Sequence, residues 1–201
     1  YNHVDTPALL KDIIREIGSP GIRHSATLGG NIANASPAGD SLVALYLFDA
    51  EIVLLSVDGE RIVPIQKFIT GVRRIDLRSN ELIKEIVIPI IPITAYKWYK
   101  VGGRRADSIS KVSFAGIYLS NFGLVSDIRF AFGSVSATVA RSIELENSLK
   151  NRPIEQIIGD LPRILEEADK MISPIDDQRS NKIYRRKVAG NIMERFIKDI
   201  A

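Results

Sequence analysis

Small and polar residues are interleaved in one stretch of the chain, Ser25–Asp40, where they could contact a ligand. Its glycines and alanines project almost no side chain, so a ligand surface could approach the backbone closely. Its other members offer hydroxyl, amide and carboxylate groups, which suit phosphate, sugar and ring-edge contacts. The residues of this stretch that we take as candidates for ligand binding are Ala26, Thr27, Gly29, Gly30, Asn31, Asn34, Ser36 and Asp40. Composition alone leaves open an ordinary glycine-rich connection, because turns use the same residues.

Charged residues elsewhere give less specific indications. Arg104–Asp107 follows two glycines, a pattern typical of a solvated turn closed by an arginine–aspartate pair. Lys100 ends an aromatic segment, from which its ammonium group could reach a ligand or extend along Trp98 and Tyr99. The basic run Tyr184–Lys187 lies on a predicted helix, where it indicates exposed surface or a partner contact more readily than a nucleic-acid site.

Several kinds of chemistry lack the residues that they need. The two histidines, His3 and His24, form neither a Ser-His-Asp set nor a cluster of metal ligands, so we expect no hydrolase and no metal bound by this chain. The chain has no cysteine and cannot supply thiolates to an iron–sulfur cluster or a structural zinc. The glycine-rich stretch matches neither G-x-G-x-x-G nor the P-loop pattern. Any iron–sulfur centre must therefore belong to another chain.

The composition is that of a folded globular protein with a substantial core. Hydrophobic residues make up 45% of the 201 residues and charged residues 25%, which are not the proportions of a disordered chain. The net charge of +3 is too small to indicate a nucleic-acid partner. No apolar run approaches the roughly 20 residues of a membrane-spanning helix, and the first residues lack the apolar centre of a signal peptide. We therefore expect a cytoplasmic protein without a membrane span.

The elements on either side of Ser25–Asp40 are predicted to be helices. Asp5-Thr6-Pro7 is typical of a helix start, with a capping side chain before a proline at the first helical position. Gly18-Ser19-Pro20 should end that helix, and Asp40-Ser41 should cap a second short helix that runs through Leu47. Ordered elements of this kind would hold the backbone of the stretch in place as a binding loop.

β-Branched residues and turn signals then predict a hairpin and a further strand. The predicted elements are strands at 51–57, 61–65 and 81–89 and a short helix at 66–71. Asp58-Gly59 is a strong hairpin turn, and Pro64 indicates that the returning strand ends there or lies at an edge. Pro89 and Pro92 interrupt the pattern, and we place a domain boundary near residue 93.

The rest of the chain predicts strands followed by helices. Three strands are predicted at 95–100, 112–119 and 124–132, arranged as an antiparallel meander. From residue 138 onward the apolar residues take helical spacing, with starts or breaks marked by Pro153, Pro162 and Pro174. Strands followed by helices indicate the α+β class. We therefore divide the chain into domains at 1–93 and 94–201.

Beyond these patterns, the run Arg23-x-x-Ala-Thr-Leu-Gly-Gly-Asn-Ile32, followed by Ala35-Ser-Pro-x-x-Asp40, resembles a flavin-binding signature. The signature is that of the medium, FAD-binding subunits of molybdenum hydroxylases of the xanthine dehydrogenase and carbon monoxide dehydrogenase type. Four further matches follow in the same order: Asp58-Gly-x-Arg61, Glu81-Leu-Ile-x-x-Ile-x-Ile-Pro89, Lys100 with Arg104-Arg-Ala-Asp107, and Asp177-x-Arg179 with Tyr184-Arg185. Each match alone is weak, but the ordered set covers nearly the whole chain and is specific.

The resemblance implies a role for each candidate residue. The positions implied to contact the FAD diphosphate and ribityl region are Thr27, Gly29, Gly30 and Asn31, and Ala26 and Asn34 are also taken as cofactor-binding. Ser36 and Asp40 are implied to make polar contacts to the same cofactor. Leu77 is implied to pack near the flavin or adenine, and Lys100 to lie close to the isoalloxazine ring. A cation there would stabilise negative charge on the reduced flavin and raise its potential.

The implied activity is electron transfer within a multi-subunit oxidoreductase. Electrons would pass from 2Fe-2S clusters on a small partner subunit through FAD on this chain to an external acceptor. A large partner subunit would carry the molybdopterin-bound molybdenum at which the substrate reacts. The absence of cysteine agrees with that division, and we assign no catalytic acid or base.

The family pattern also includes a small N-terminal α/β lobe with another glycine-rich loop, which nothing in this sequence matches. We therefore expect the second lobe of an FAD-binding domain, followed by a three-stranded antiparallel sheet with helices. Two alternatives remain open. One, favoured by the missing lobe, is a non-catalytic interaction module that keeps the fold without flavin; the other is a small nucleotide-binding regulator that uses the same stretch.

Overall fold

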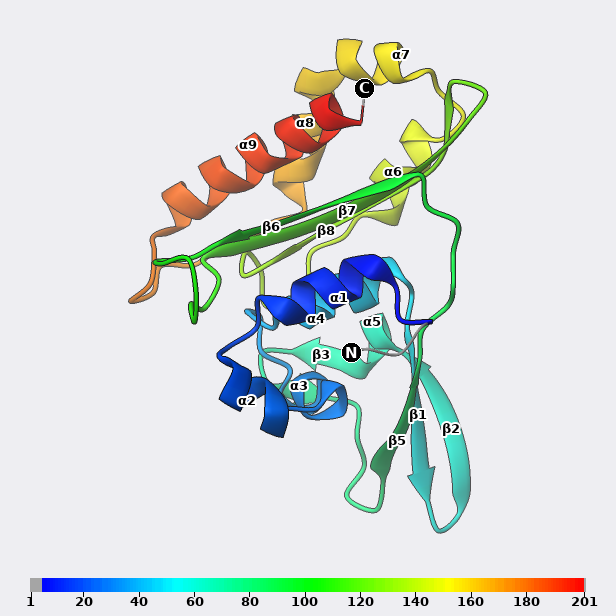
Figure 1. Cartoon of the computed structure of the whole chain (residues 1–201), viewed down its shortest axis with the longest axis vertical. Coiled ribbons are helices and arrows are strands. Elements are labelled where there is room, and N and C mark those ends of the chain that lie inside the picture. Colours follow the sequence, from blue (N-terminus) through cyan, green and yellow to red (C-terminus); the bar gives the residue numbers. More distant parts are fainter. Residues whose placement is uncertain (1–4, 201) are drawn as a thin grey trace.

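The computed structural model describes residues 5–200, so the expectation for His3 lies outside it (Figure 1). The helices are α1 (Ala8–Arg15), α2 (Pro20–Ser25), α3 (Leu28–Asn34), α4 (Asp40–Leu47), α5 (Ile65–Phe68), α6 (Ile143–Leu149), α7 (Ile154–Gly159), α8 (Leu161–Lys170) and α9 (Lys182–Asp199). The strands are β1 (Glu51–Ser56), β2 (Gly59–Pro64), β3 (Ile69–Gly71), β4 (Arg74–Ile75), β5 (Leu82–Val87), β6 (Ala95–Val101), β7 (Val112–Asn121) and β8 (Leu124–Gly133). They pair antiparallel in the orders β2-β1-β5, β3-β4 and β6-β7-β8, which confirms the α+β class.

Helix α1 buries the predicted apolar face but starts differently from the prediction. Its N-cap is Pro7, which makes no side-chain capping bond, so the predicted cap by Asp5 or Thr6 is wrong. Pro7 has a ψ of 136°, which is extended backbone, and the helical conformation therefore begins only at the next residue. The proline stands just outside the helix instead of at its first position.

The stretch predicted as a binding loop contains helix α3, and helix α2 precedes it and ends at Ser25, which corrects the prediction. Helix α2 begins after Ser19, whose hydroxyl accepts the Ile22 N–H at 3.3 Å. Helix α3 begins after Thr27, whose Oγ1 accepts the Gly30 N–H at 2.9 Å. Both helices are short, and glycine, serine and asparagine have weak helix propensity, so the sequence signalled them only by their hydroxyl caps and, for α2, by Pro20 at the first helical position. Ala35 closes α3 in the left-handed conformation, with a φ of 43°.

Helix α4 lies at the centre of the molecule and is buried along its whole length. It confirms the helix predicted from Asp40 to Leu47, but its N-cap is Gly39, without a side-chain capping bond. A helix that is apolar on all sides has to be covered on all sides. Helices α1 and α3 pack beside it, and the sheet β6-β7-β8 lies over it (Figure 1). Helix α4 therefore joins the N-terminal elements to that sheet.

The predicted hairpin is confirmed as β1 and β2, which are joined at Asp58-Gly59. The next predicted strand is confirmed as β5, which pairs with the other edge of β1. The helix predicted at 66–71 is wrong in extent, because α5 ends at Phe68 and the chain then enters the unpredicted ribbon of β3 and β4. Strands β1, β2 and β5 extend away from the body of the molecule (Figure 1).

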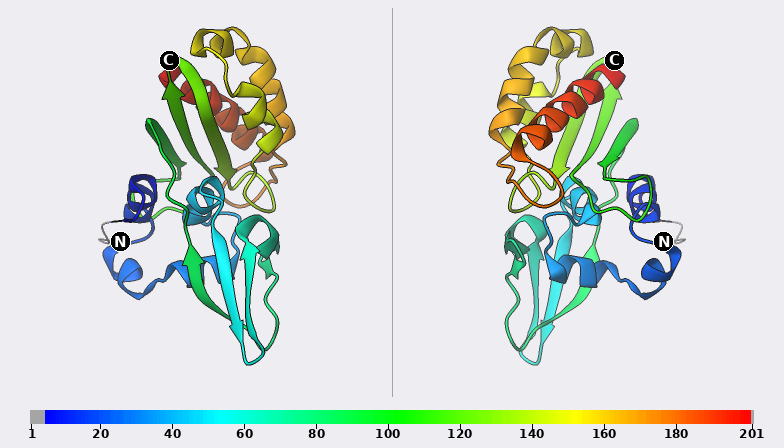
Figure 2. Two further views of the ribbon diagram at one scale, coloured as in Figure 1. Left: turned by 90° about the vertical axis from the view of Figure 1, so that its right-hand side faces the viewer. Right: turned by 90° about the vertical axis from the view of Figure 1, so that its left-hand side faces the viewer.

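The predicted meander is confirmed as β6-β7-β8, and both of its faces are covered (Figure 2). Helices α1 and α4 pack on one face, and α6 and α9 pack on the other. Because successive strand residues point to opposite faces, they enter different cores. Ala115 and Ile117 join the core around α4, whereas Phe114 and Phe132 join the core under α9. The ring centroid of Phe114 lies 5.2 Å from that of Phe196 on α9.

The C-terminal helices follow the predicted positions of the prolines. Pro153 is the N-cap of α7, and Pro162 lies in the first turn of α8, where its missing N–H leaves no bond unmade. Pro174 lies between α8 and α9. The helical region predicted from residue 138 is thereby confirmed as a set of short helices followed by the longer α9.

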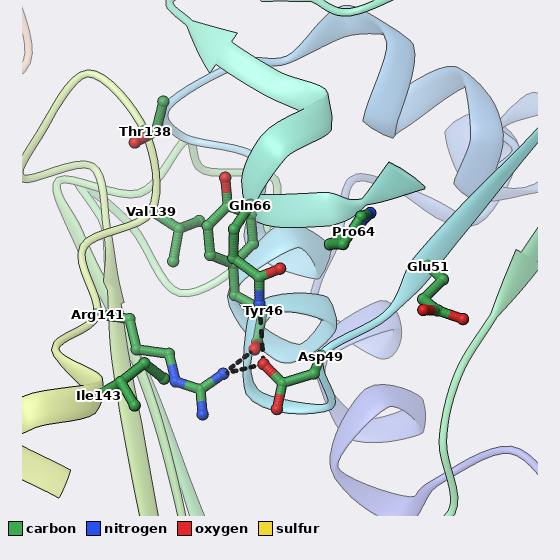
Figure 3. Close-up of a pocket in the computed structure, with 9 residues that line it drawn as sticks. All are labelled: Tyr46, Asp49, Glu51, Pro64, Gln66, Thr138, Val139, Arg141 and Ile143. Atoms are coloured by element: carbon green, nitrogen blue, oxygen red, sulfur yellow. Dashed lines mark hydrogen bonds and ion pairs between the residues drawn. The ribbon is translucent and has the colours of Figure 1, made fainter. Parts of the chain in front are cut away.

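Two arginines of the C-terminal half cap the end of α4. Arg129 Nη1 donates to Leu47 O and to Asp49 Oδ2, each at 2.8 Å. Arg141 Nη1 donates to Tyr46 O and, at 2.7 Å, to Asp49 Oδ1 (Figure 3). Guanidinium groups suit this place because the carbonyls at a helix C-terminus carry partial negative charge. Helix α4 is thus held from the C-terminal half at its last turn.

The same Arg141 forms a buried ion pair with Glu146, whose side chain is 2% exposed. Arg141 Nε donates to Glu146 Oε1 at 2.9 Å, and the Phe130 N–H donates to the same oxygen at 2.9 Å. Burial raises the pKa of Glu146 above its ordinary value. Burial alone would lower the pKa of Arg141, but its hydrogen bond to Glu146 and the charge of that carboxylate raise it overall. Each charge of the pair therefore depends on its partner.

Candidate functional site

A cavity of about 660 Å³ opens between α1, α2 and α3. The residues that line it are Thr6, Leu10, Ile14, Ile17, Pro20, Arg23, His24, Ala26, Thr27, Leu28, Asn31, Ser41 and Ile88. Its volume is typical of a small-molecule site, and its wall combines apolar side chains with a few polar groups. Three of the predicted binding residues, Ala26, Thr27 and Asn31, share this wall.

At Gly30 and Gly39, near the cavity, neighbouring atoms of the protein leave little room for a side chain. A Cβ on Gly30 would lie 3.0 Å from Thr27 Oγ1, the atom that caps α3. A Cβ on Gly39 would lie 3.1 Å from Ser36 O and 3.2 Å from Asn31 Oδ1. These three distances are shorter than most real contacts of a Cβ atom. The close packing of the protein around these two positions therefore requires small residues there.

Asn31 connects α3 to α4 and keeps a free donor. Its Oδ1 accepts the Ser41 Oγ–H at 2.7 Å. Within residues 5–200, its side-chain nitrogen donates to no protein group in this orientation of the amide. Since Asn31 also lines the cavity, its N–H groups can serve an acceptor on a ligand.

Asp40 and Lys100, two predicted binding residues from opposite halves of the chain, form a buried ion pair. The distance from Lys100 Nζ to Asp40 Oδ2 is 2.8 Å, and the two side chains are 8% and 5% exposed. Asp40 Oδ1 accepts the Ser110 Oγ–H at 2.6 Å. Lys100 Nζ also donates to Glu16 O at 2.7 Å. Additional hydrogen bonds of this kind are what a buried ion pair needs to offset the loss of water.

Side chains of β6 also hold α1, which forms one wall of the cavity. Trp98 Nε1 donates to Glu16 Oε2 at 3.0 Å, and the Tyr96 hydroxyl donates to Asp12 Oδ2 at 2.7 Å. The bond to the Asp12 carboxylate, together with burial, raises the pKa of Tyr96. Together with Lys100, these bonds fix α1 against the meander, so the cavity wall depends on the C-terminal half.

The other predicted binding residues do not line this cavity. They are Gly29, Gly30, Asn34, Ser36, Asp40, Leu77 and Lys100. Asn34 is exposed, and Ser36 Oγ accepts the Ala38 N–H at 3.3 Å. Leu77 is half-buried against the core around α4. The structure therefore brings three predicted residues together in a cavity wall and two others in a buried ion pair, whereas the rest belong to neither.

Two arginine-centred motifs of the sequence hold segments in place. Arg61 donates through Nε and Nη2 to the two oxygens of Glu81, at 2.6 and 2.8 Å, and through Nη1 to Asp76 Oδ2 at 2.7 Å. The hydrogen bond from Arg61, reinforced by the Arg78 N–H, lowers the pKa of Glu81 to about 2. The segment that carries Leu77 is thereby closed onto the hairpin, so these motif residues position it.

Arg185, which is 3% exposed, anchors the start of α9. It donates to Lys111 O at 2.6 Å, to Ser134 O at 2.7 Å and to Asp177 Oδ1 at 2.8 Å. The bonds join α9 to the start of β7 and to the end of β8. The basic run of this helix therefore includes a buried anchor, and the prediction of exposed surface is wrong for that residue.

The charged run after the two glycines is an exposed turn, as predicted, but its contact differs from the expected one. Arg104 Nη2 donates to the backbone oxygen of Asp107 at 2.6 Å, and its Nε donates to Ala106 O at 3.0 Å. The predicted arginine–aspartate ion pair is wrong, because the guanidinium group closes the turn through main-chain acceptors.

Three residues beside the predicted set were missed by sequence reasoning: Glu16, Ser41 and Ser110. Ser41 was assigned only a capping role next to Asp40, and its contact with Asn31 depends on the fold. Glu16 and Ser110 meet Lys100 and Asp40 from distant parts of the chain. No local pattern could have indicated them.

A separate cavity of about 560 Å³ lies at the end of α4 and contains none of the predicted binding residues (Figure 3). Its wall is formed by Tyr46, Asp49, Glu51, Pro64, Gln66, Thr138, Val139, Arg141 and Ile143. Burial raises the pKa of Tyr46 to about 12, so its phenol stays neutral. Gln66 Nε2 donates to Asp49 Oδ1 at 2.9 Å, so Asp49 accepts from Gln66 as well as from Arg129 and Arg141. Residues of both halves of the chain form its wall, so this cavity lies where the two halves meet.

Neither a metal site nor a membrane span is found in the part of the chain that the structure describes. Across residues 5–200, no group of three or more histidine, cysteine, aspartate or glutamate side chains is placed to hold a metal ion. None of the helices within this range is long and apolar enough to cross a membrane.

Two domain families match the chain in succession. The family described as "FAD binding domain in molybdopterin dehydrogenase" matches residues 3–91. The family described as "CO dehydrogenase flavoprotein C-terminal domain" matches residues 97–200, which is more than half of the chain.

Several relatives align over most of this sequence. The glyceraldehyde dehydrogenase medium chain of Sulfolobus acidocaldarius is 30% identical over 195 residues, which cover 96% of this chain and 68% of that protein. The xanthine dehydrogenase FAD-binding subunit of Escherichia coli O157:H7 is 29% identical over 185 residues, covering 91% of this chain and 63% of that protein. The chain thus spans about two thirds of the length of these relatives.

Solved structures agree with the sequence comparisons. The structure of a Cu,Mo-CO dehydrogenase in its cyanide-inactivated form matches with a TM-score of 0.82 and 26% identity, covering 92% of this chain and 65% of the other. Quinoline 2-oxidoreductase from Pseudomonas putida 86 shares the fold, with a TM-score of 0.84 at 22% identity over 95% of this chain and 66% of the other. The chain therefore belongs to the family of FAD-binding medium subunits of the molybdenum hydroxylases, of the xanthine dehydrogenase and carbon monoxide dehydrogenase type.

Proposed function

We propose that this chain binds FAD at the cavity beside α3 and serves as the flavin-bearing, electron-transfer subunit of a molybdenum-containing oxidoreductase. The observation that carries the proposal is the meeting of three signature residues, Ala26, Thr27 and Asn31, in the wall of one cavity. When bound, FAD supplies the redox chemistry, and the protein supplies position, electrostatics and access for the acceptor.

The chain's own groups suit such a cofactor. The residues proposed to hold the diphosphate and ribityl region are Ala26, Thr27, Gly29, Gly30, Asn31 and Asn34, with Ser36 and Asp40 as further polar contacts. Leu77 is proposed to pack near the flavin or adenine, and Lys100 to lie near the isoalloxazine. Lys100 forms an ion pair with Asp40, so it would act on the cofactor as one half of a nearly neutral pair.

The partners follow from the same assignment. Electrons would arrive from 2Fe-2S clusters on a small subunit, the substrate would react at molybdenum on a large subunit, and an external acceptor would receive the electrons. The chain has no cysteine with which to hold a cluster itself. We also keep the proposed division into an FAD-binding part at 1–93 and a C-terminal part at 94–201, which share one core around α4.

A visible spectrum tests the proposal. Purified chain is mixed with FAD, desalted and scanned, and the same measurement is made on chain co-expressed with its small and large subunits. Flavin bands that survive desalting in either sample support the proposal. A complex that assembles without flavin would contradict it and favour the non-catalytic interaction module.

A further inference from the structure

We infer that Ser110 is a positioning residue for the proposed cofactor site, because it orients the carboxylate of Asp40 and thereby sets how the charge of Lys100 is presented there. The inference rests on the proposed FAD site. Ser110 has no exposed surface and follows the exposed turn between β6 and β7. It contacts the end of the signature stretch from a distant part of the chain.

The two oxygens of Asp40 are each assigned to one donor. Oδ1 accepts from Ser110 at 2.6 Å, and Oδ2 lies 2.8 Å from Lys100 Nζ. A short hydrogen bond is expected where the acceptor is charged. With the serine hydroxyl on Oδ1, the carboxylate cannot turn both oxygens toward the ammonium group. Ser110 therefore keeps part of the aspartate charge away from the lysine.

Lys100 is left with a free donor by this arrangement. An ammonium group has three N–H donors. Lys100 Nζ forms an ion pair with Asp40 Oδ2 at 2.8 Å and donates a hydrogen bond to Glu16 O at 2.7 Å, and no third partner is found among residues 5–200, so a third donor stays free. A carboxylate freed from Ser110 could take that third donor, which would make Lys100 less available to a ligand.

The C-terminal half of the chain, which contains Ser110, also holds the backbone of the stretch Ser25–Asp40 in place. The Ser134 N–H donates to Pro37 O at 2.9 Å, a few residues before Asp40. Residues that follow β6 and β8 thus hold the end of the stretch at two points, one through the main chain and one through Ser110. A change at Ser110 should therefore alter the charge at the site more than the path of the backbone.

A second buried serine provides a matched control. Ser113 on β7 also has no exposed surface, but its Oγ has no hydrogen-bond partner. Ser113→Ala removes the same atom as Ser110→Ala without breaking a bond. Ser110→Thr keeps a hydroxyl at the position and serves as the rescuing variant.

The test measures FAD affinity by flavin fluorescence and the midpoint potential of the bound flavin, in the co-expressed complex. FAD binding should be severalfold weaker in Ser110→Ala, because the freed Asp40 carboxylate then makes Lys100 less available to the cofactor. The midpoint potential should become more negative, because Lys100, held more closely by Asp40, then offers less positive charge to the reduced flavin. Ser113→Ala and Ser110→Thr should match the wild type in both. Unchanged affinity and potential in Ser110→Ala, or equal changes in Ser113→Ala, would overturn the inference.

A double-mutant cycle separates this inference from the proposed function. Unfolding of the free chain by urea is compared for Ser110→Ala, Asp40→Asn and the double variant. We expect the unfolding constants to show a coupling of at least fivefold, whereas multiplicative effects would contradict the inference. A wild-type complex without flavin would refute the proposed function and leave this coupling measurable. Should Ser110→Ala fail to fold, Ser110→Cys takes its place in the cycle.

Discussion

Replacing Gly116 with alanine should destabilise the packing of α9 on the meander. A Cβ at this position on β7 would lie 2.6 Å from Cε2 and Cζ of Phe196, closer than real Cβ contacts. The Phe196 ring has no exposed surface and packs against Phe114, so it has no open space into which to move. The added methyl group must therefore displace the ring or lift the helix.

The magnitude follows from two opposing effects. Overpacking of a well-filled core costs about 1–3 kcal/mol. Replacing glycine by alanine within a strand gains back roughly 0.5–1 kcal/mol of backbone entropy. Overpacking is the larger effect, so we expect a net loss of about 1–2 kcal/mol in the free energy of unfolding. Phe196→Leu should relieve the contact, so the double variant should lose less than the sum of the single losses.

Urea unfolding at constant pH measures these free energies. Gly190→Ala on α9 is the matched control, because a Cβ there meets nothing within 4 Å and should stabilise the helix by up to about 1 kcal/mol. If Gly116→Ala were as stable as the wild type, or if its effect simply added to that of Phe196→Leu, the packing argument would be refuted.

Three other predictions address the site and its supports. Gly30→Val should abolish retention of FAD after desalting with little loss of fold, because the cofactor is proposed to approach the backbone closely there. Normal flavin content in this variant would contradict the proposed FAD site. Glu81→Gln should remove a pH-dependent part of the stability: because Arg61 lowers the pKa of Glu81 from 4.5 to about 2, that part is complete above pH 4.5 and is lost as the pH falls toward 2. The gap in Tm between wild type and Glu81→Gln should therefore narrow in acid, and a constant gap would contradict this. Arg141→Met leaves Glu146 buried without its partner and should cost about 3–5 kcal/mol by urea unfolding, while a loss under 1 kcal/mol would show that the pair is dispensable.

Elements whose signals are local were predicted well. The hairpin of β1 and β2 has a strong turn at Asp58-Gly59, and the meander has alternating strands, so each pattern could be recognised without knowledge of its neighbours. The helices α2 and α3 were not predicted, because their glycines and small polar residues are also typical of turns. Their formation depends on the caps at Ser19 and Thr27 and, for α3, on packing against α4.

The sequence by itself determined the α+β class, the order of most strands and helices, and the residues of the flavin signature, because these depend on local patterning and on motifs in order. The roles of those residues toward FAD stay predictions. Only the tertiary structure decided which residues meet. It showed that Asp40 and Lys100 neutralise each other and that Ser110 and Glu16 complete their hydrogen bonds. Contacts between distant segments arise from the packing of α4 between the halves, and no local pattern encodes such packing.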